Sequence, residues 1–430
     1  MSAENENVRL FRGGEIASEE SPFLQSADVL VEGDRITRVG AGLEAPDGAE
    51  IDDCAGCVLM PAMFDLNVHA CEPGKEQKET IKSCSEAAIN GGVTGIVLMP
   101  NTLPAIDSGG LVQTVLDIVA EKSRIAVLQT GCITKGRAGE ELAAIAGMAA
   151  KGVPMLTDDG DAVADSRLLR RAMEYAKDFD LPLAMHCEEK SLSGRGAINE
   201  GPVSYRLGLP GIPSISEEIC LARDIRLARY TGAQIHIQHV STAKGMESIR
   251  RAKNDGVRIS CEVAPHHLIF NEEDIVDYDA NYKMNPPLRT AEDNEQLLQG
   301  LIEGVFDVVA TDHSPHTEFE KQNGDFASAP FGITGLETAV VSLYHHFIKT
   351  DRFGWDLLVR RYSAEPRRIL GLDPVPVAEG GIAEFLIFST ERTTTFSREY
   401  MKSKSANTPF LDRTLDGQVV SVVRGGEVLK

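Results

Sequence analysis

Eight short apolar runs, separated by longer stretches with helical spacing, limit most strongly how this chain can fold. The runs are rich in aliphatic and β-branched residues, as expected for strands buried on both faces. The segments 78–92 and 166–180 between them have the apolar spacing of amphipathic helices. The runs span residues 62–70, 94–101, 125–134, 153–160, 182–188, 233–241, 258–267 and 306–316. Eight strand–helix units predict an α/β fold, a closed (β/α)8 TIM barrel.

Polar side chains mark the carboxyl ends of these runs. Five of them, each on a different run, are His69, Asp159, His186, His239 and Asp312. Active sites of such barrels lie at the C-terminal ends of the strands, whereas polar groups at the other end serve stability. Six of the ten histidines lie at strand ends, so the sequence predicts one functional site at the barrel mouth.

Both ends of the chain differ from the middle. Residues 27–40 alternate apolar and polar residues around a glycine turn, which is typical of a β-hairpin. Residues 381–389 and 417–430 are also strand-rich and punctuated by glycine. We therefore predict a small β-rich domain formed from both termini. The predicted bounds are 1–60 and 373–430 for this domain and 61–372 for the barrel.

Composition argues against several classes of function. The chain has 43 Lys and Arg against 65 Asp and Glu, and a net charge of −22 disfavours nucleic acid as a partner. No run approaches 18 apolar residues, so neither a membrane span nor a membrane partner is expected. Residues 1–7 are polar and acidic, unlike an export signal. We therefore expect a cytoplasmic protein whose eight cysteines are reduced thiols.

The five strand-end groups have the chemistry of a metal site. Three imidazoles and two carboxylates suit Zn²⁺, and a carboxylate can bridge two ions. Such a site activates water, and a further carboxylate can carry the proton to a leaving nitrogen. Asp312 is the candidate for that catalytic role. A lone strand-end histidine is more often structural, but five such groups together favour a metal-dependent hydrolase of a small molecule.

Ten short segments give the chain a specific resemblance. In order between residues 55 and 410 they are FDLNVHACEPG, MPNT, TDDG, HCE, HVST, VAPHHL, NYKMNPPLR, ATDHSPHT, APFG and NTPF. Together they resemble the signature segments of dihydroorotases, the amidohydrolases allied to the multifunctional proteins of pyrimidine biosynthesis. The resemblance implies reversible, zinc-dependent cyclisation of N-carbamoyl-L-aspartate to dihydroorotate.

The resemblance also implies a set of metal ligands. His69 resembles a ligand of the first of two metals. His186 and His239 resemble ligands of the second. Asp159 resembles the carboxylate that bridges them, and the neighbouring Asp158 stays open as the alternative.

Further roles follow from the same resemblance. Asp312 resembles the residue that both binds metal and carries the proton. Segment 317–328 is either a lid over the site or a plain surface loop. His236 occupies an alternate strand position and is expected to pack outside the barrel lumen. The implied substrate contacts are Asn101, Asn285, His316, Phe331 and Gly332.

The first motif departs from the family pattern at two positions. The family has His-X-His followed shortly by Arg, where this chain has Asn67, His69 and Cys71. Asn67 is at most a weak ligand, because an amide oxygen binds Zn²⁺ less well than an imidazole nitrogen. We therefore expect one tightly held Zn²⁺ at the second site, with a second ion held weakly or absent. The family's arginine at this position is implied to hold the substrate carboxylate, and a neutral thiol cannot replace it. Cys71 is therefore a doubtful substrate contact, because the loss of a buried charge partner costs about 3–5 kcal/mol.

Two alternatives follow from these departures. One is a catalytically inactive homologue that acts as a structural partner of a carbamoyltransferase. Retention of the other site groups argues against it, because buried His and Asp are costly unless they are used. The other is a hydrolase of a cyclic amide without the carboxylate. Related hydantoin-type enzymes usually bridge their metals with a modified lysine, which this chain lacks. By analogy with the architecture, we expect a homo-oligomer.

Overall fold

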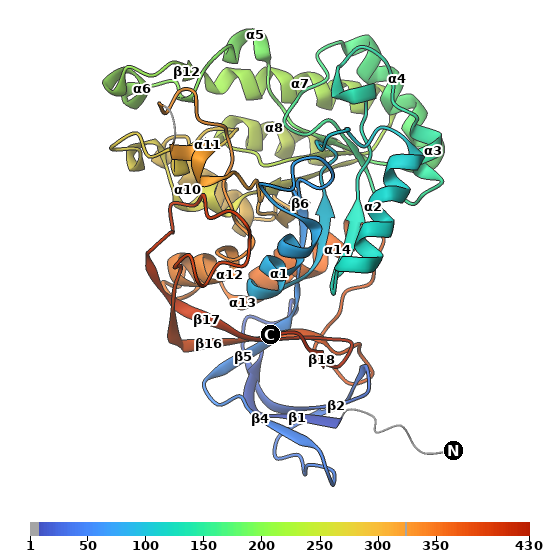
Figure 1. Ribbon diagram of the computed structural model, residues 1–430, viewed down its shortest axis with the longest axis vertical. Helices are drawn as coiled ribbons and strands as arrows, with labels where there is room; N and C mark the ends of the chain where they lie inside the picture. Colours follow the sequence, from blue (N-terminus) through green and yellow to red (C-terminus); the bar gives the residue numbers. More distant parts are fainter. Residues whose placement is uncertain (1–7, 323–324) are drawn as a thin grey trace.

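The computed structural model describes residues 8–322 and 325–430 (Figure 1). A strand lies in each of the eight predicted runs. Parallel pairing joins β6, β7 and β8 in one set and β9, β10, β13, β14 and β15 in another. The bounds are β6 Met63–Val68, β7 Val93–Leu98, β8 Ala126–Gln129, β9 Leu156–Thr157, β10 Leu183–Met185, β13 Ile235–Ile237, β14 Ile259–Val263 and β15 Val308–Val309.

Two isolated bridges close these sets into a barrel. Gly131 pairs with Leu156 between β8 and β9, and Val68 pairs with His313 just after β15. The backbone N–H of His69 donates to the carbonyl of His313 at 2.8 Å. The predicted (β/α)8 barrel is therefore confirmed.

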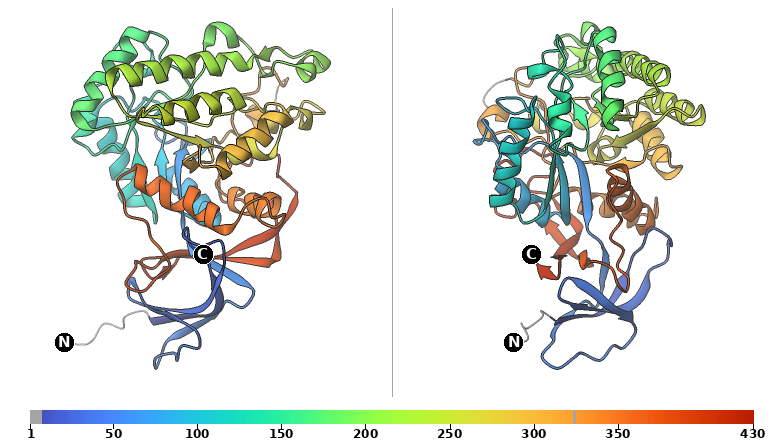
Figure 2. Two further views of the ribbon diagram at one scale, coloured as in Figure 1. Left: turned by 180° about the vertical axis from the view of Figure 1, so that it is seen from behind. Right: turned by 90° about the vertical axis from the view of Figure 1, so that its right-hand side faces the viewer.

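Helices cover the outside of the barrel (Figure 2). Side chains fix where they begin: Thr80 accepts from the N–H of Ser83 at the start of α1, and Asp165 caps α4. The predicted helices over 78–92 and 166–180 are thus present. The bounds are α1 Ile81–Asn90, α2 Gly109–Lys122, α3 Ile145–Ala149, α4 Ser166–Ala176, α5 Lys190–Ser193, α6 Pro202–Leu207, α7 Ser214–Thr231, α8 Ala243–Asn254, α9 Pro265–Ile269, α10 Ala291–Ile302, α11 Glu318–Gln322, α12 Ala339–Leu343, α13 Trp355–Val359 and α14 Glu365–Ile369.

The barrel wall is packed on both faces, which explains why its strands are apolar almost throughout. Outward residues such as Ile96 and Ile235 join the helices in the main core. A second cluster lies inside the barrel and includes Val97 of β7 and Val308 of β15, strands that are not neighbours. Side chains therefore fill the barrel and leave its functional groups at the mouth.

Strands from both termini form one further sheet, in the order β18-β17-β16-β5-β1-β2-β3 with β4 beside β1. The rings of Phe11 in β1 and Phe385 in β16 meet edge to face at 5.0 Å. The predicted small β domain is thus confirmed, while its exact bounds remain predictions. The strands are β1 Val8–Ile16, β2 Gln25–Glu32, β3 Arg35–Gly40, β4 Glu50–Asp53, β5 Cys57–Pro61, β16 Glu384–Thr395, β17 Thr414–Arg424 and β18 Glu427–Val428; a separate pair is β11 Ile198–Asn199 and β12 Gly211–Ile212.

No helix in the described part of the chain is both long and apolar enough to cross a membrane. All eight cysteines are described, and each is a free thiol. Residues 1–7, on which the expectation about export rests, lie outside the described residues.

Candidate metal centre

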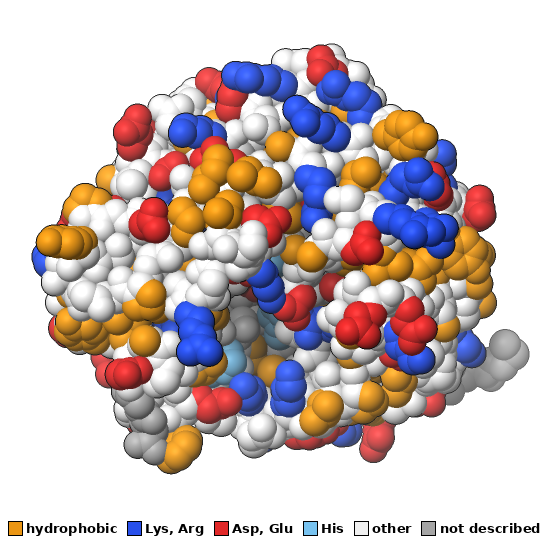
Figure 3. Space-filling model, turned by 90° about the horizontal axis from the view of Figure 1, so that it is seen from above, with side chains coloured by type: hydrophobic (Ala, Val, Ile, Leu, Met, Phe, Trp, Pro, Cys, Tyr) orange, Lys and Arg blue, Asp and Glu red, His pale blue; other side chains and the backbone are white. Residues whose placement is uncertain are grey.

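A cavity of about 240 Å³ opens at the C-terminal ends of the barrel strands. From above, histidines are visible inside a hollow of this face, with Lys and Arg side chains around it (Figure 3). The cavity brings together ten residues predicted from the sequence, whereas Asn67 and Cys71 do not line it. Its walls are His69, Asn101, Asp159, Gly160, His186, His239, Asn285, Asp312, Ser314, His316, Phe331 and Gly332.

One group of three buried side chains converges on a single point. The Nδ1 atom of His186 lies 3.2 Å from Nε2 of His239. Oδ1 of Asp159 lies 3.3 Å from that Nε2 and 4.0 Å from that Nδ1. Two imidazole nitrogens and a carboxylate oxygen are a donor set that Zn²⁺ favours.

A second group shares Asp159 with the first. Nε2 of His69 lies 3.3 Å from Oδ2 of Asp159 and 3.2 Å from Oδ1 of Asp312. Asp159 therefore presents one oxygen to each group, which is the position of a bridging carboxylate.

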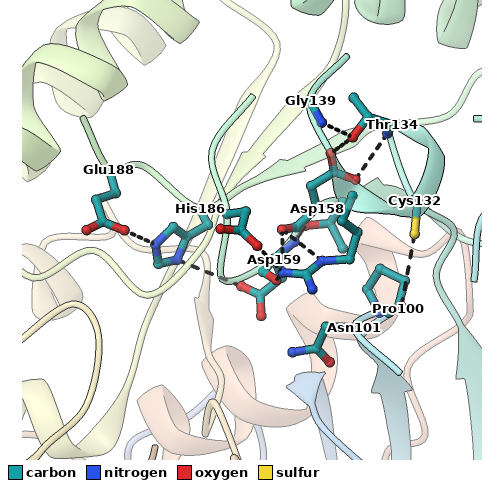
Figure 4. Close-up of polar contacts among 12 residues, drawn as sticks. Pro100, Asn101, Cys132, Thr134, Gly139, Asp158, Asp159, His186 and Glu188 are labelled. Atoms are coloured by element: carbon teal, nitrogen blue, oxygen red, sulfur yellow. Dashed lines mark hydrogen bonds and ion pairs between the residues drawn. The ribbon is translucent and has the colours of Figure 1, made fainter. Parts of the chain in front are cut away.

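The neighbouring Asp158 is fully engaged elsewhere (Figure 4). Its carboxylate accepts from the backbone N–H groups of Ile133 and Thr134 at 2.9 and 3.1 Å, and from the Thr134 hydroxyl. These bonds direct Asp158 away from the cavity, so the geometry favours Asp159 over Asp158 as the bridge.

Hydrogen bonds on the far side of the imidazole rings hold two of them in place. Nδ1 of His69 lies 2.9 Å from Oδ1 of Asn101, and Nε2 of His186 lies 3.4 Å from Oε2 of Glu188. Asn285 donates to the same Glu188 oxygen at 3.2 Å. Each partner leaves the opposite nitrogen free to face the site. Sequence reasoning missed Glu188, although it is the acid of the strand-end segment HCE.

Burial and charge shape the protonation of the site. Burial raises the pKa of Asp312 above its usual range. Burial opposes ionisation of Asp159 too, but the hydrogen bond from His239 and the charges of the surrounding histidines hold its pKa below the usual range. His239 is buried, yet its contact with Asp159 raises its pKa to about 9. Without metal, the cluster is therefore stabilised by protons, which a metal ion would displace.

Two residues of the site have backbone strain. Asp312 has φ 49° and His239 has φ 32°, both in the left-handed region. Such conformations cost about 1–3 kcal/mol each and persist where the surrounding structure enforces them. They turn both side chains toward the cavity at the point where each strand ends.

Asn67 is held by a partner outside the cavity wall. Its amide nitrogen donates to Glu262 at 2.9 Å, and its Oδ1 has no hydrogen-bond partner among the described residues. The bond joins β6 to β14, which are not neighbours, so it crosses the barrel interior. The orphaned oxygen fits the predicted role of a weak ligand, which stays a prediction.

The expectation that His236 packs outside the lumen is wrong. Its Nε2 lies 3.0 Å from Glu262 inside the barrel, and its Nδ1 lies 2.8 Å from the Ser260 hydroxyl. The positive φ of His239 breaks the strand alternation, so positions 236 and 239 do not point to opposite faces.

Cys71 contributes no charge to the site. Burial raises the pKa of its thiol to about 12, so the thiol is neutral. Its sulfur lies 3.9 Å from the carbonyl oxygen of His69. The structure thus offers no anion clamp at this position.

Segment 317–328, expected to be either a lid or a surface loop, is anchored at its helical part. The buried Lys321 of α11 donates to the carbonyls of Ala280, Lys283 and Pro330 at 2.9–3.0 Å. Residues 323 and 324 lie outside the described residues. Closure over the site stays a prediction.

Comparison with known proteins gives a consistent result. A family model described as "Dihydro-orotase-like" matches residues 56–245. The dihydroorotase of Carboxydothermus hydrogenoformans is 41% identical over 423 residues, covering 97% of both chains. That of Pelobacter propionicus is 40% identical, covering 98% of this chain and 99% of its own.

Solved structures show the same fold at lower sequence identity. Dihydropyrimidinase from Brevibacillus agri matches with a TM-score of 0.84 at 22% identity, covering 98% of this chain and 95% of its own. L-hydantoinase from Arthrobacter aurescens matches with a TM-score of 0.85 at 20% identity, with the same coverage. At such identities the likeness shows the architecture alone.

Proposed function

The chain belongs to the dihydroorotase family of the amidohydrolase superfamily, and we propose that it catalyses the reversible cyclisation of N-carbamoyl-L-aspartate to dihydroorotate in pyrimidine biosynthesis. The observation that carries this proposal is the pair of buried ligand groups that share Asp159 at the barrel mouth. A cytoplasmic homo-oligomer, free or associated with a carbamoyltransferase, is the proposed setting.

We propose that one Zn²⁺ ion is held by Asp159, His186 and His239. Their three ligand atoms already face one another, and Glu188 orients the ring of His186. A bound zinc ion supplies a Lewis acid that polarises a carbonyl and makes water more acidic. The other group has a single imidazole, so a second ion there would be held more weakly.

Asp312 is the proposed proton carrier. In the hydrolytic direction it accepts a proton from the attacking water, whose oxygen bonds to the ring carbonyl carbon. The carbon–nitrogen bond then breaks, and Asp312 returns the proton to the departing nitrogen. Burial raises the pKa of Asp312, which makes its carboxylate a stronger base, and the contact with His69 fixes the orientation of the side chain. Cyclisation follows the same steps in reverse.

The remaining cavity residues are the proposed substrate contacts. Asn101, Asn285 and His316 present polar atoms, and Phe331 and Gly332 lie on the same wall. The N–H of Gly332 already donates to the carbonyl of Lys283 at 2.9 Å. Its carbonyl accepts from Nδ2 of Asn407 at 3.0 Å and keeps one further lone pair. We therefore assign Gly332 a role through that lone pair and its small size, because a Cβ there would lie 2.7 Å from the carbonyl oxygen of Ser314.

The test combines metal content and turnover on one sample. Purified protein is expected to contain about one zinc per chain and to hydrolyse dihydroorotate, while Asp312→Asn keeps the zinc and loses turnover. Zinc without turnover of dihydroorotate, together with turnover of a neutral cyclic ureide, would contradict the proposal. Absence of both zinc and turnover after zinc is added back would favour the structural-partner alternative. Growth of a pyrimidine-requiring host without pyrimidines provides an independent check.

A further inference from the structure

The loop between β6 and α1 places two lysines behind the cavity wall. We propose that Lys75, assisted by Lys78, binds the substrate carboxylate in place of the arginine that this chain lacks at Cys71. This inference rests on the proposed function, because it names the group that would recognise the carboxylate of dihydroorotate.

Lys75 begins close to the position that lacks the charge. Its backbone N–H donates to the carbonyl of Cys71 at 3.0 Å, so the two residues are joined by one turn of chain. A lysine side chain is long enough to return along that turn toward the cavity. Its Nζ donates to the carbonyl oxygen of Asn101, a cavity residue, at 2.9 Å. Two further N–H donors of the ammonium group remain for a ligand.

Among the described residues, the ammonium group of Lys75 donates to the Asn101 carbonyl and forms no ion pair with a carboxylate. It is half-buried, and burial lowers its pKa, with Lys78 and Arg137 lowering it further. A partly buried cation without an anionic partner is costly. An anion arriving beside Asn101 would offset that cost, which is the expected property of a carboxylate site.

Lys78 connects the same loop to His316, another residue of the cavity wall. Its Nζ lies 3.1 Å from Nδ1 of His316 and 2.7 Å from Oε1 of Glu320. Burial and Lys78 lower the pKa of His316 to about 3, so this imidazole is neutral and accepts at Nδ1. Its Nε2 then carries the ring proton, and the backbone of Phe331 accepts a hydrogen bond from the ring. Because Glu320 already pairs with Lys78, Lys75 is the principal cation.

Arg137, a further cation near the site, is already engaged. Its guanidinium donates to the carbonyl oxygen of Asp159 at 2.6 Å and pairs with Asp161 at 2.7 Å. It therefore positions the Asp159 loop and is not available to an incoming carboxylate.

Binding of matched anionic and neutral ligands tests the proposal directly. Orotate carries the carboxylate and uracil lacks it, and calorimetry on the zinc-loaded full chain measures both. Lys75→Met is expected to weaken orotate binding by about 10- to 100-fold, the effect of losing one charged hydrogen bond, and to leave uracil binding unchanged. Lys82→Met removes the same charge from an exposed site on α1 and should change neither.

A rescue experiment separates recognition from general damage. Adding Cys71→Arg to Lys75→Met should recover most of the orotate affinity and lower the raised KM for dihydroorotate, with little change in kcat. Lys75→Gln serves as a second variant and should behave as Lys75→Met does.

Each outcome bears on one of the two proposals. Orotate binding that is equal or absent in both wild type and Lys75→Met overturns the lysine assignment and leaves the proposed reaction to its own assay. Lysine-dependent orotate binding without turnover of dihydroorotate supports the assignment and contradicts the proposed function. Loss of uracil and orotate binding together in the Lys75 variants shows a structural role and also overturns the assignment.

Discussion

The two ligand groups of the site share one carboxylate but are built differently. The group of Asp159, His186 and His239 offers three converging atoms, with Glu188 behind one ring. The group of His69 and Asp312 has a single imidazole, and the nearby Asn67 gives its amide nitrogen to Glu262. The barrel thus fixes the positions of the ligand side chains, and we propose that the motif on β6 determines how many metal ions they hold.

The largest expected difference between the two groups is in zinc retention. A zinc site with four ligands is worth about 10–16 kcal/mol, so the loss of one ligand corresponds to roughly 100- to 1000-fold in affinity. His239→Ala should show this loss, whereas His69→Ala should weaken zinc binding by less than about 10-fold. Competition with a chromophoric chelator measures both, and circular dichroism confirms folding. Equal losses of zinc affinity in the two variants would contradict the proposal that the group of Asp159, His186 and His239 holds zinc more tightly.

Asp312→Asn should lower turnover without changing the amount of bound zinc. The loss of a positioned proton carrier typically lowers turnover by about 100- to 10,000-fold. Because the zinc is assigned to the other group, the variant should keep its metal. Elemental analysis and a dihydroorotate assay on the same sample check both statements. Zinc loss in parallel with activity would place the metal beside Asp312 instead.

Glu188→Gln should weaken zinc binding by about 10- to 100-fold, the usual effect of a partner behind a metal-binding histidine. Burial opposes its ionisation, but the contact with His186 lowers the pKa of Glu188 to about 2. The carboxylate is therefore ionised at pH 6 and at pH 8. The loss of zinc affinity in Glu188→Gln should be the same at both pH values. Chelator competition at the two pH values measures it. A deficit that disappears at pH 6 would contradict this account of the site.

Asn67→His should have the smallest effect on turnover and change the metal count instead. The new imidazole gives the weaker group a second nitrogen ligand, so the content should rise from about one to about two zinc ions per chain. The lost amide bond to Glu262 should lower the melting temperature slightly. Titration with zinc followed by gel filtration and elemental analysis gives the count. A count that stays at one would show that position 67 does not decide it.

Much of the barrel and of the site wall could be predicted from sequence. All eight strand runs and the five strand-end groups of the metal site follow from local spacing and from the rule that strand ends share one rim. The five substrate contacts follow only from the family resemblance. Contacts between distant side chains could not be read in this way. The hydrogen bond from Thr134 holds Asp158 and leaves Asp159 to face the site. The amide of Asn67 bonds to Glu262 from across the barrel. Lys75 donates to the backbone carbonyl of Asn101, a residue 26 positions later.

Diffraction from crystals grown with zinc, recorded at wavelengths on both sides of the zinc absorption edge, tests whether Asp159, His186 and His239 hold the metal. We expect one strong anomalous peak among Nδ1 of His186, Nε2 of His239 and Oδ1 of Asp159. A peak of equal or greater height between His69 and Asp312 would contradict it.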